Sequence, residues 1–534
     1  MMDTWLHGWS GLALGYAAVQ GPMIAGLVRA RATFSHYALS PLVALPLTAI
    51  VAGGSAMFAS HGAIPIAIAA GASAVLGYTG GRVIANDDAT DKIHQRGSLI
   101  ADPAARRAVF SKQSSREAGI TLAGIALPEL DETKHFKLIG TTGTGKSTAV
   151  QEIMSSALAR GDRAVITDPD GSYVRRFYQE DRGDIILNPF DERSVKWDLF
   201  AEIRNSYDVE QLARSLIPDH EGGDRSWRGY ARTFFTAVTR QARAAGISDV
   251  GELYRLLVVA DAGELRRLVG GTPAQPFLDE HNSRMFDSIR SVTSSAVGAL
   301  DYISQQKAPP LSIRDWVSDQ KPGVLFIPYK AGQIAALRST ISAWMRLAIF
   351  ETMDHSEENT RLWFVVDELD ALGQIDGLKD ALARLRKFNG RCVLGFQSLA
   401  QVSSTYGADA HTIIENCGNT LILRCSSSEG GGTARFASQL IGEREVLRTT
   451  VSRSRRPTEM LDSVSRTQHY SVESAVLPSE VEQLPDLTGY LKYAGDPTWA
   501  RVRLAATKAW QDAKSEAQRS RDARPQRILD ASHE

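Results

Sequence analysis

The first 85 residues of the chain contain three uncharged, mostly apolar stretches separated by short polar breaks. The stretches cover residues 8–28, 37–59 and 63–81. A membrane span needs roughly 20 mostly apolar residues, and the second and third stretches approach that length. Arg29, Arg31 and Arg82 flank this pair, whereas the break between its members carries no Lys or Arg. The pattern predicts a transmembrane hairpin with both ends in the cytoplasm, because basic residues concentrate on that side.

The first stretch, residues 8–28, admits two readings. It is either a third span or an interfacial segment set by Trp5 and Trp9. A cleaved signal peptide is disfavoured because no basic segment precedes the apolar run. A buried core rich in Ala and Gly is the weaker alternative for all three stretches.

Beyond residue 135 short apolar runs alternate with helical periodicity, which is typical of a parallel, doubly wound α/β sheet. A strand at 136–139 precedes a helix at 147–159, and helical periodicity alone dominates residues 204–310. The remaining strands are expected at 164–167, 184–187, 323–328, 362–366, 392–396 and 420–424. The sheet is therefore predicted to be interrupted by an all-α insertion.

These patterns divide the chain into five parts. The predicted parts are a membrane anchor at 1–85, a juxtamembrane connector with the first half of the α/β domain at 86–203, the all-α insertion at 204–310, the second half of the α/β domain at 311–510, and a disordered tail at 511–534.

Charge and cysteine content limit the functional classes. The formal net charge is −1, whereas a protein that grips nucleic acid with its outer surface is usually basic, so any such contact must be local, in a channel or on loops. Cys392, Cys417 and Cys425 form no C-x-x-C pair and fall in predicted core segments. They are interpreted as small apolar residues, not as metal or redox sites.

Residues 140–147 read GTTGTGKS and match G-x-x-x-x-G-K-[ST] completely. Glycines let backbone N–H groups surround phosphates, while Lys146 neutralises the β- and γ-phosphates and Ser147 ligates Mg²⁺. The helix that follows directs its positive end toward the anion. The sequence thus predicts an ATP and Mg²⁺ site whose nucleotide-binding residues are Gly140, Thr141, Thr142, Gly143, Thr144, Gly145, Lys146, Ser147 and Thr148.

A second acidic element follows the apolar run 362–366. Asp367 is predicted to hold Mg²⁺ through water, and Glu368 to polarise the attacking water. An apolar run followed by two acids is a weak signal alone, but together with a complete P-loop it indicates a hydrolytic enzyme.

Two further residues have candidate catalytic roles. Gln397 follows the strand predicted at 392–396 and is placed to sense the γ-phosphate. Arg386 could act as an arginine finger on a neighbouring subunit. A solvated basic helix end is an equal alternative for Arg384, Arg386 and Lys387.

Two basic segments, expected to be loops or helix surface, could track a phosphate backbone, although most charge runs are simply solvated. The first contains Arg225, Arg228, Arg232, Arg240 and Arg243, and the second contains Arg444, Arg448, Arg453, Arg455 and Arg456.

A series of motifs resembles the type IV coupling proteins of conjugation and type IV secretion, the TraD/TrwB group. In order they are KLIGTTGTGKST, VITDPDGSYVRRF, DIILNPFDERSVKWDLFAEI, LWFVVDELDALGQIDGL, ALARLRKFNGRCVLGFQSLAQV and LPSEVEQLPDLTGYL. The match covers residues from about 90 to 505.

The resemblance implies a RecA-like P-loop domain with an all-α insertion, assembled as a homohexamer on the bacterial inner membrane. It implies ATP-driven pumping of DNA, in single-stranded form through a central channel, and partners among relaxase and secretion-channel proteins. It also favours Arg386 as the trans finger, with Arg424 as a rival, and Gln397 as the sensor.

Other function classes remain open on sequence grounds. They are an FtsK/HerA-like DNA translocase, a receptor that exports only proteins, and a passive docking receptor in which nucleotide merely stabilises the ring.

Overall fold

The computed structural model describes residues 2–30, 32, 34–57, 64–85, 92–101, 119–218, 225–319, 321–354, 361–428, 431–454 and 463–506. The tail predicted for 511–534 lies outside these residues. Two compact units are present, one built from residues 1–97 and 444–473 and the other from residues 98–443 and 474–534.

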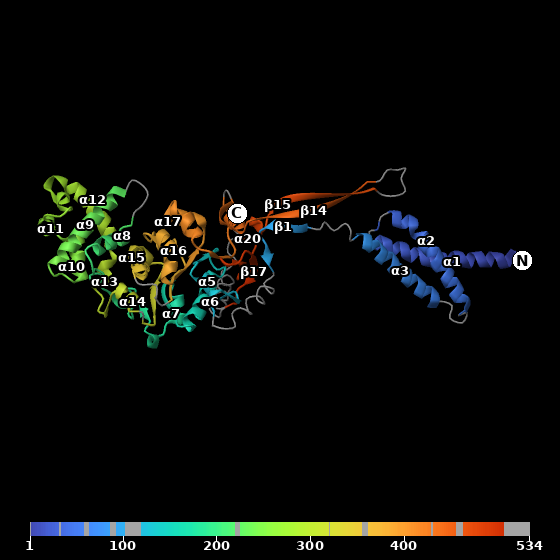
Figure 1. Ribbon diagram of the computed structural model, residues 1–534, viewed down its shortest axis with the longest axis horizontal. Coiled ribbons are helices and arrows are strands. Elements are labelled where there is room, and N and C mark those ends of the chain that lie inside the picture. Colours follow the sequence, from blue (N-terminus) through green and yellow to red (C-terminus); the bar gives the residue numbers. More distant parts are fainter. Residues whose placement is uncertain are drawn as a thin grey trace, which may run out of the picture. The chain divides into compact units, whose positions relative to one another are not determined.

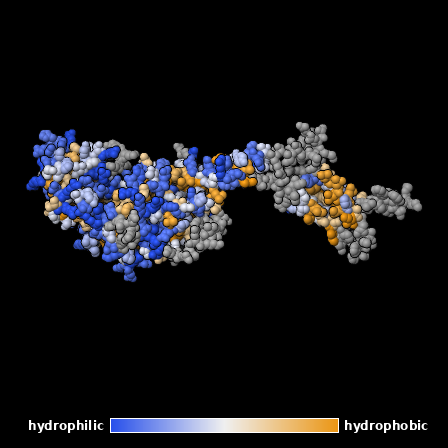
Figure 2. Space-filling view, in the orientation of Figure 1, coloured by the Kyte–Doolittle hydropathy of each residue, from blue (hydrophilic) through white to orange (hydrophobic). Residues whose placement is uncertain are grey.

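Three long helices open the first unit: α1 (Met2–Arg29), α2 (Phe34–Met57) and α3 (Ile64–Ala85). They enclose a small core that includes Val19, Met23 and Ala44. Many of their large apolar side chains face outward, and Figure 2 shows this hydrophobic surface. Over the part of the chain that is described, no helix combines the length and the apolar character that a bilayer crossing requires.

A three-stranded sheet completes the first unit. It consists of β1 (Lys92–Gly97), β14 (Glu443–Ser454) and β15 (Ser463–Ser474) in the order β1-β14-β15, and β1 is antiparallel to β14. The expectation of a basic loop around Arg444–Arg453 is therefore wrong, because the segment is a strand as far as Ser454. Arg455 and Arg456 lie outside the described residues.

A ten-stranded sheet forms the centre of the second unit. Its order is β2 (Ile100–Ala101), β17 (Trp499–Arg503), β16 (Thr488–Lys492), β13 (Asn419–Ile422), β5 (Phe136–Ile139), β12 (Gly390–Phe396), β11 (Leu362–Val366), β6 (Arg163–Pro169), β10 (Val324–Tyr329) and β7 (Ile185–Ile186). From β13 to β7 all neighbours are parallel, whereas β16 is antiparallel to both of its neighbours. The predicted parallel strands are all present.

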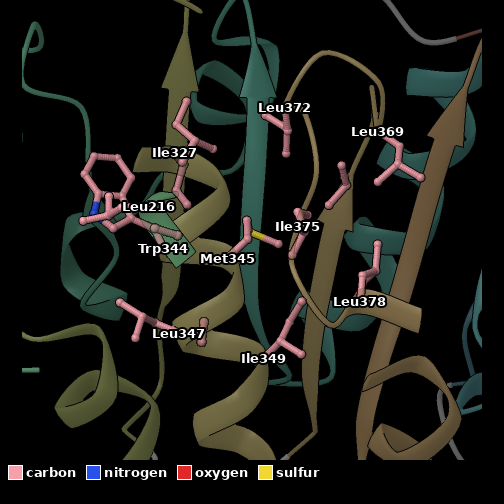
Figure 3. Packing of buried hydrophobic residues seen from close by; sticks show 14 of the residues in the cluster. Leu216, Ile327, Trp344, Met345, Leu347, Ile349, Leu369, Leu372, Ile375 and Leu378 are labelled. Atoms are coloured by element: carbon pink, nitrogen blue, oxygen red, sulfur yellow. The ribbon is translucent and has the colours of Figure 1, made fainter. Parts of the chain in front are cut away.

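Helices cover both faces of this sheet, so its central strands are buried on both sides. Along β11, Phe364 and Val366 enter one core while Trp363 and Val365 enter the other. The first core is completed by α15 (Ile334–Asp354), and the second by α6 (Lys146–Ala159). Figure 3 shows Trp344, Met345, Leu347 and Ile349 of α15 packed in the first core.

The all-α insertion lies at one end of the second unit, as the green helices of Figure 1 show. Its helices are α8 (Asp208–Leu216), α9 (Arg225–Ala244), α10 (Val250–Tyr254), α11 (Ala262–Leu268), α12 (Ser283–Val297) and α13 (Ala299–Ser304). The chain enters the insertion after β8 (Lys196–Trp197) and leaves it at β9 (Pro310–Leu311), and these two short strands pair with each other in parallel. The predicted insertion into an α/β domain is thereby confirmed.

The remaining elements of this unit are short. They are β3 (Thr121–Leu122), β4 (Ile125–Ala126), α5 (Glu129–Glu132), α7 (Ser172–Phe177), α14 (Ile313–Ser318), α16 (Leu378–Leu385), α17 (Leu399–Tyr406), α18 (Asp409–Glu415), α19 (Gly432–Ile441) and α20 (Pro478–Glu482). All three cysteines are buried and free, as expected for core residues.

Candidate nucleotide site

The glycine-rich loop leaves β5 and enters α6 at the carboxyl edge of the sheet. Its backbone is held by the neighbouring strands, since Gly140 N donates to Phe396 O and Thr141 N donates to Arg424 O. Gly145 has φ 119°, and a Cβ there would lie 2.8 Å from Leu487 Cδ2, so only glycine fits. No side chain caps the N-terminus of α6, which leaves its backbone N–H groups for an anion.

Lys146, the predicted phosphate-binding lysine, lies over this loop. Its ammonium donates to Gly140 O at 2.6 Å and to Thr141 O at 3.2 Å. Burial lowers the pKa of Lys146, and the carboxylates of Asp367 and Glu368 oppose that change. A phosphate would give this buried cation a stronger partner than neutral carbonyl groups.

Ser147 and Asp367 are 220 residues apart in sequence, and the fold brings them into contact. Ser147 Oγ donates to Asp367 Oδ2 at 2.7 Å. The other carboxylate oxygen, Oδ1, is buried and has no hydrogen-bond partner among the described residues. A hydroxyl and a carboxylate in this arrangement are ligands that suit Mg²⁺.

Glu368 and Gln397 meet beside the loop because β12, which delivers Gln397, lies between β5 and β11. Gln397 Nε2 donates to Glu368 Oε1 at 3.2 Å, and Thr142 Oγ1 donates to Gln397 Oε1 at 3.0 Å. Burial raises the pKa of Glu368, as do the charges of Asp367 and Asp370. The amide thus joins the predicted water-activating carboxylate to the phosphate loop.

Sequence reasoning missed Tyr173, which belongs to this site. The side chain is fully buried on α7, and its hydroxyl donates to Asp367 Oδ2 at 2.7 Å. Asp168, at the end of β6, accepts hydrogen bonds from the backbone N–H groups of Tyr173 and Val174 and so fixes the start of α7. Burial raises the pKa of Asp168 to about 6. From the sequence, the segment VITDPDGSYVRRF contributes only to the family resemblance, which does not reveal the contact with Asp367.

Arg386 is exposed and lies far from its own phosphate loop. It precedes the amino end of β12, whereas the loop follows the carboxyl end of the parallel neighbour β5. Arg424 lies next to the loop, but its guanidinium pairs with Asp486 at 2.7 Å.

The basic residues of α9 have internal partners. Arg228 and Arg232 donate to the carbonyl groups of Pro218 and Ile217 beyond the end of α8, and Arg240 pairs with Glu210 at 2.9 Å. Arg225 and Arg243 are exposed. On β14, Arg444 and Arg448 both pair with Glu473. Most of the described arginines in these two basic segments therefore have partners within the protein.

A hollow of about 1120 Å³ lies between α12 and the segment 370–374. Arg228 and Arg338 line it, but so do Asp287 and Asp370. Because the arginines are matched by aspartates, the charge of the lining does not favour binding of a phosphate backbone in this hollow.

Comparison with known proteins agrees with this geometry. Residues 119–505 match the family described as "Type IV secretion-system coupling protein DNA-binding domain". The chain belongs to this family. It is similar to coupling protein TraD of Escherichia coli strain K12, with 32% identity over 406 residues that make up 75% of this chain and 56% of TraD. The chain thus spans little more than half the length of that relative.

Solved structures of the coupling protein TrwB share the fold. The unbound form of TrwBdeltaN70 has 32% identity and a TM-score of 0.70, covering 78% of this chain and 95% of that chain. TrwB in complex with ADP and Mg²⁺ has 31% identity and a TM-score of 0.69, covering 78% of this chain and 96% of that chain. The coupling-protein fold, a RecA-like domain with an all-α insertion, is therefore established for this chain.

Proposed function

We propose that this coupling protein binds and hydrolyses ATP with Mg²⁺. The observation that carries the proposal is the contact between Ser147 and Asp367, which joins a complete phosphate loop to the acid that follows β11. The TrwB structure with ADP and Mg²⁺ supports the choice of ligands.

In this proposal the residues from Gly140 to Thr148 hold the nucleotide. Lys146 neutralises the phosphates, and Ser147 and Asp367 hold Mg²⁺. Glu368 would accept a proton from the attacking water. Gln397, which contacts both Glu368 and Thr142, would orient Glu368 and sense the γ-phosphate. The bound Mg²⁺ supplies a charge that stabilises the phosphoryl oxygens in the transition state.

Arg386 serves the site of a neighbouring copy in a ring, as a finger that neutralises transition-state charge. Its exposure and its place at the opposite edge of its own sheet support action in trans. Arg424 is the weaker candidate because Asp486 already neutralises it.

The cellular role that follows is ATP-driven transfer of DNA, single-stranded in a central channel of a homohexamer, into a conjugation or type IV secretion apparatus. Relaxase and inner-membrane channel proteins are the proposed partners. Membership of a family described by a DNA-binding domain supports this role, as does the similarity to TraD.

The substitution Lys146→Ala tests the proposal. It removes the charge that binds the phosphates, so both ATP turnover and DNA transfer between cells should be lost. DNA transfer that persists without turnover would contradict the motor function and favour a passive docking receptor.

We further propose that α2 and α3 anchor the chain in the bacterial inner membrane as a hairpin. Their outward-facing Leu39, Leu42, Leu45, Ile50 and Ile68 support a lipid-facing surface. A chain without residues 1–85 should remain in the supernatant when membranes are sedimented. If this shortened chain still pellets with membranes, the anchor lies elsewhere.

A further inference from the structure

The turn that carries Arg386 is shaped by contacts of its own. Arg386–Phe388 form a 3-10 turn, Asn389 has φ 60°, and β12 starts at Gly390. Arg391 Nη1 donates to Asn389 O at 2.7 Å and to Asn389 Oδ1 at 2.9 Å. A Cβ at Gly390 would lie 2.6 Å from Leu385 Cδ2. The backbone path after Arg386 is therefore tightly defined.

Arg391 is in turn held by a buried acid. Its Nε donates to Glu132 Oε2 at 2.9 Å, and the side chains of Arg391 and Glu132 are 2% and 0% exposed. A buried charge pair is stable only when its remaining donors and acceptors are also satisfied. Here Nη1 of Arg391 is satisfied by two oxygens of Asn389.

Glu132 also binds the end of the phosphate-loop helix. Arg160, the residue after α6, donates to both Glu132 oxygens at 2.7 and 2.8 Å. Asp162 accepts from Arg160 at 2.6 Å and from Trp363 Nε1 at 2.9 Å. Two arginines and two acids thus form a neutral cluster beneath the sheet's amino edge. The opposite end of α6 carries Lys146 and Ser147.

We propose that Glu132, Arg391 and Asn389 are positioning residues for Arg386. They form a clamp that holds the 386–390 turn at a constant position relative to α6, and so present Arg386 to the nucleotide of the next copy. The inference rests on the proposed function, in which Arg386 acts in trans. It goes further by assigning a role in catalysis to side chains remote from any nucleotide.

The substitution Glu132→Gln in the full chain tests the clamp. A neutral amide cannot hold both arginines, so Arg386 is displaced. A displacement of about 1 Å can cost about 100-fold in rate, so we expect kcat for ATP to fall by that order while nucleotide affinity is unchanged. The matched control is Glu129→Gln, which alters a half-exposed acid paired with Arg361 and should leave kcat unchanged. An equal fall of kcat in Glu132→Gln and Glu129→Gln, or a fall of nucleotide affinity in Glu132→Gln, would overturn the inference.

Mixing variants separates positioning in trans from a local defect. Lys146→Ala copies cannot use their own site but still present an intact Arg386. When mixed with Glu132→Gln copies, they should restore turnover at the Glu132→Gln sites. Mixing Glu132→Gln with Arg386→Ala should restore nothing, because neither copy offers a well-placed finger. Equal ATP turnover in the two mixtures would overturn the inference.

Asn389→Gly provides a milder variant should Glu132→Gln fail to fold. Glycine adopts φ 60° without strain and leaves every buried charge in place. It removes the Oδ1 contact of Arg391 and should lower kcat by several-fold, with rescue by Lys146→Ala copies. Unchanged kcat would contradict the clamp. Absence of turnover in the unmodified chain would instead refute the proposed function, and the inference with it.

Discussion

The hydroxyl of Tyr173 donates to Asp367 Oδ2 at 2.7 Å, the same oxygen that accepts a hydrogen bond from Ser147. Burial, and then the charge of Asp367, raise the pKa of Tyr173, so the phenol stays protonated as a donor. It fixes the orientation of Asp367 and leaves Oδ1 available to a metal or its water ligands.

Tyr173→Phe should therefore weaken the response to Mg²⁺. Loss of a hydrogen bond to a metal-ligating carboxylate typically costs about 10–100-fold in metal affinity. The Mg²⁺ concentration for half-maximal ATP turnover should rise by that order. Tyr178→Phe is the control, since that ring packs on Phe326 away from Asp367. An unchanged Mg²⁺ response in Tyr173→Phe would show that Tyr173 serves only the core.

Glu368→Gln should separate binding of ATP from its hydrolysis. The amide keeps the size of the side chain but cannot accept a proton, and general-base catalysis contributes about 10²–10⁴-fold to rate. ATP turnover should fall by that factor while a fluorescent ATP analogue binds as it does to the unmodified chain. Normal turnover would remove Glu368 from its proposed role.

The pH dependence of turnover should reflect the acidic surroundings of Glu368. Burial, Asp367 and Asp370 raise its pKa above the ordinary value of 4.5. The base must be ionised, so turnover should fall as the pH drops through this raised pKa. Asp370→Asn removes one of the charges that raise it and should move the acid limb to lower pH. A shift to higher pH would contradict this electrostatic account.

Much of the α/β domain follows from sequence because short, continuously apolar strands sit next to recognisable motifs. The strands at 136–139 and 362–366 have the predicted bounds. By contrast, α15 lacks a helical apolar stripe because it is buried on nearly all sides, and β14 is rich in Arg, Thr and Ser. Only tertiary pairing reveals such elements.

The site divides in the same way. Lys146, Ser147 and Asp367 could be named from contiguous motifs, and the structure brings Ser147 and Asp367 into contact, while their roles stay predictions. Tyr173 could not be named in this way, because its contact with Asp367 joins two segments that follow the neighbouring strands β6 and β11 and are far apart in sequence. The partners of the basic residues on α9 and β14 could not be predicted for the same reason. Arg228 on α9 bonds to the Pro218 carbonyl and Arg444 on β14 pairs with Glu473, and both contacts form only in the folded chain.

A pair of tryptophans tests the packing between the sheet and the insertion. Trp197 and Trp344 are both fully buried, and their rings pack edge to face with centroids 5.9 Å apart. Trp197 Nε1 donates to the buried Glu202 at 3.0 Å, whereas Trp344 Nε1 has no partner among the described residues. Trp197→Phe leaves the Glu202 carboxylate without this donor, so it should lower the free energy of unfolding by about 1–3 kcal/mol more than Trp344→Phe does. Thermal unfolding of the two variants measures the difference, and equal midpoints would contradict it.

The most direct test of an ATP-driven DNA motor is the ATP turnover of the purified chain, measured over a range of protein concentrations with and without single-stranded DNA. A site completed by Arg386 of a neighbouring copy predicts turnover per molecule that rises with protein concentration, and rises further when DNA is added. Turnover per molecule that is independent of both would contradict the account.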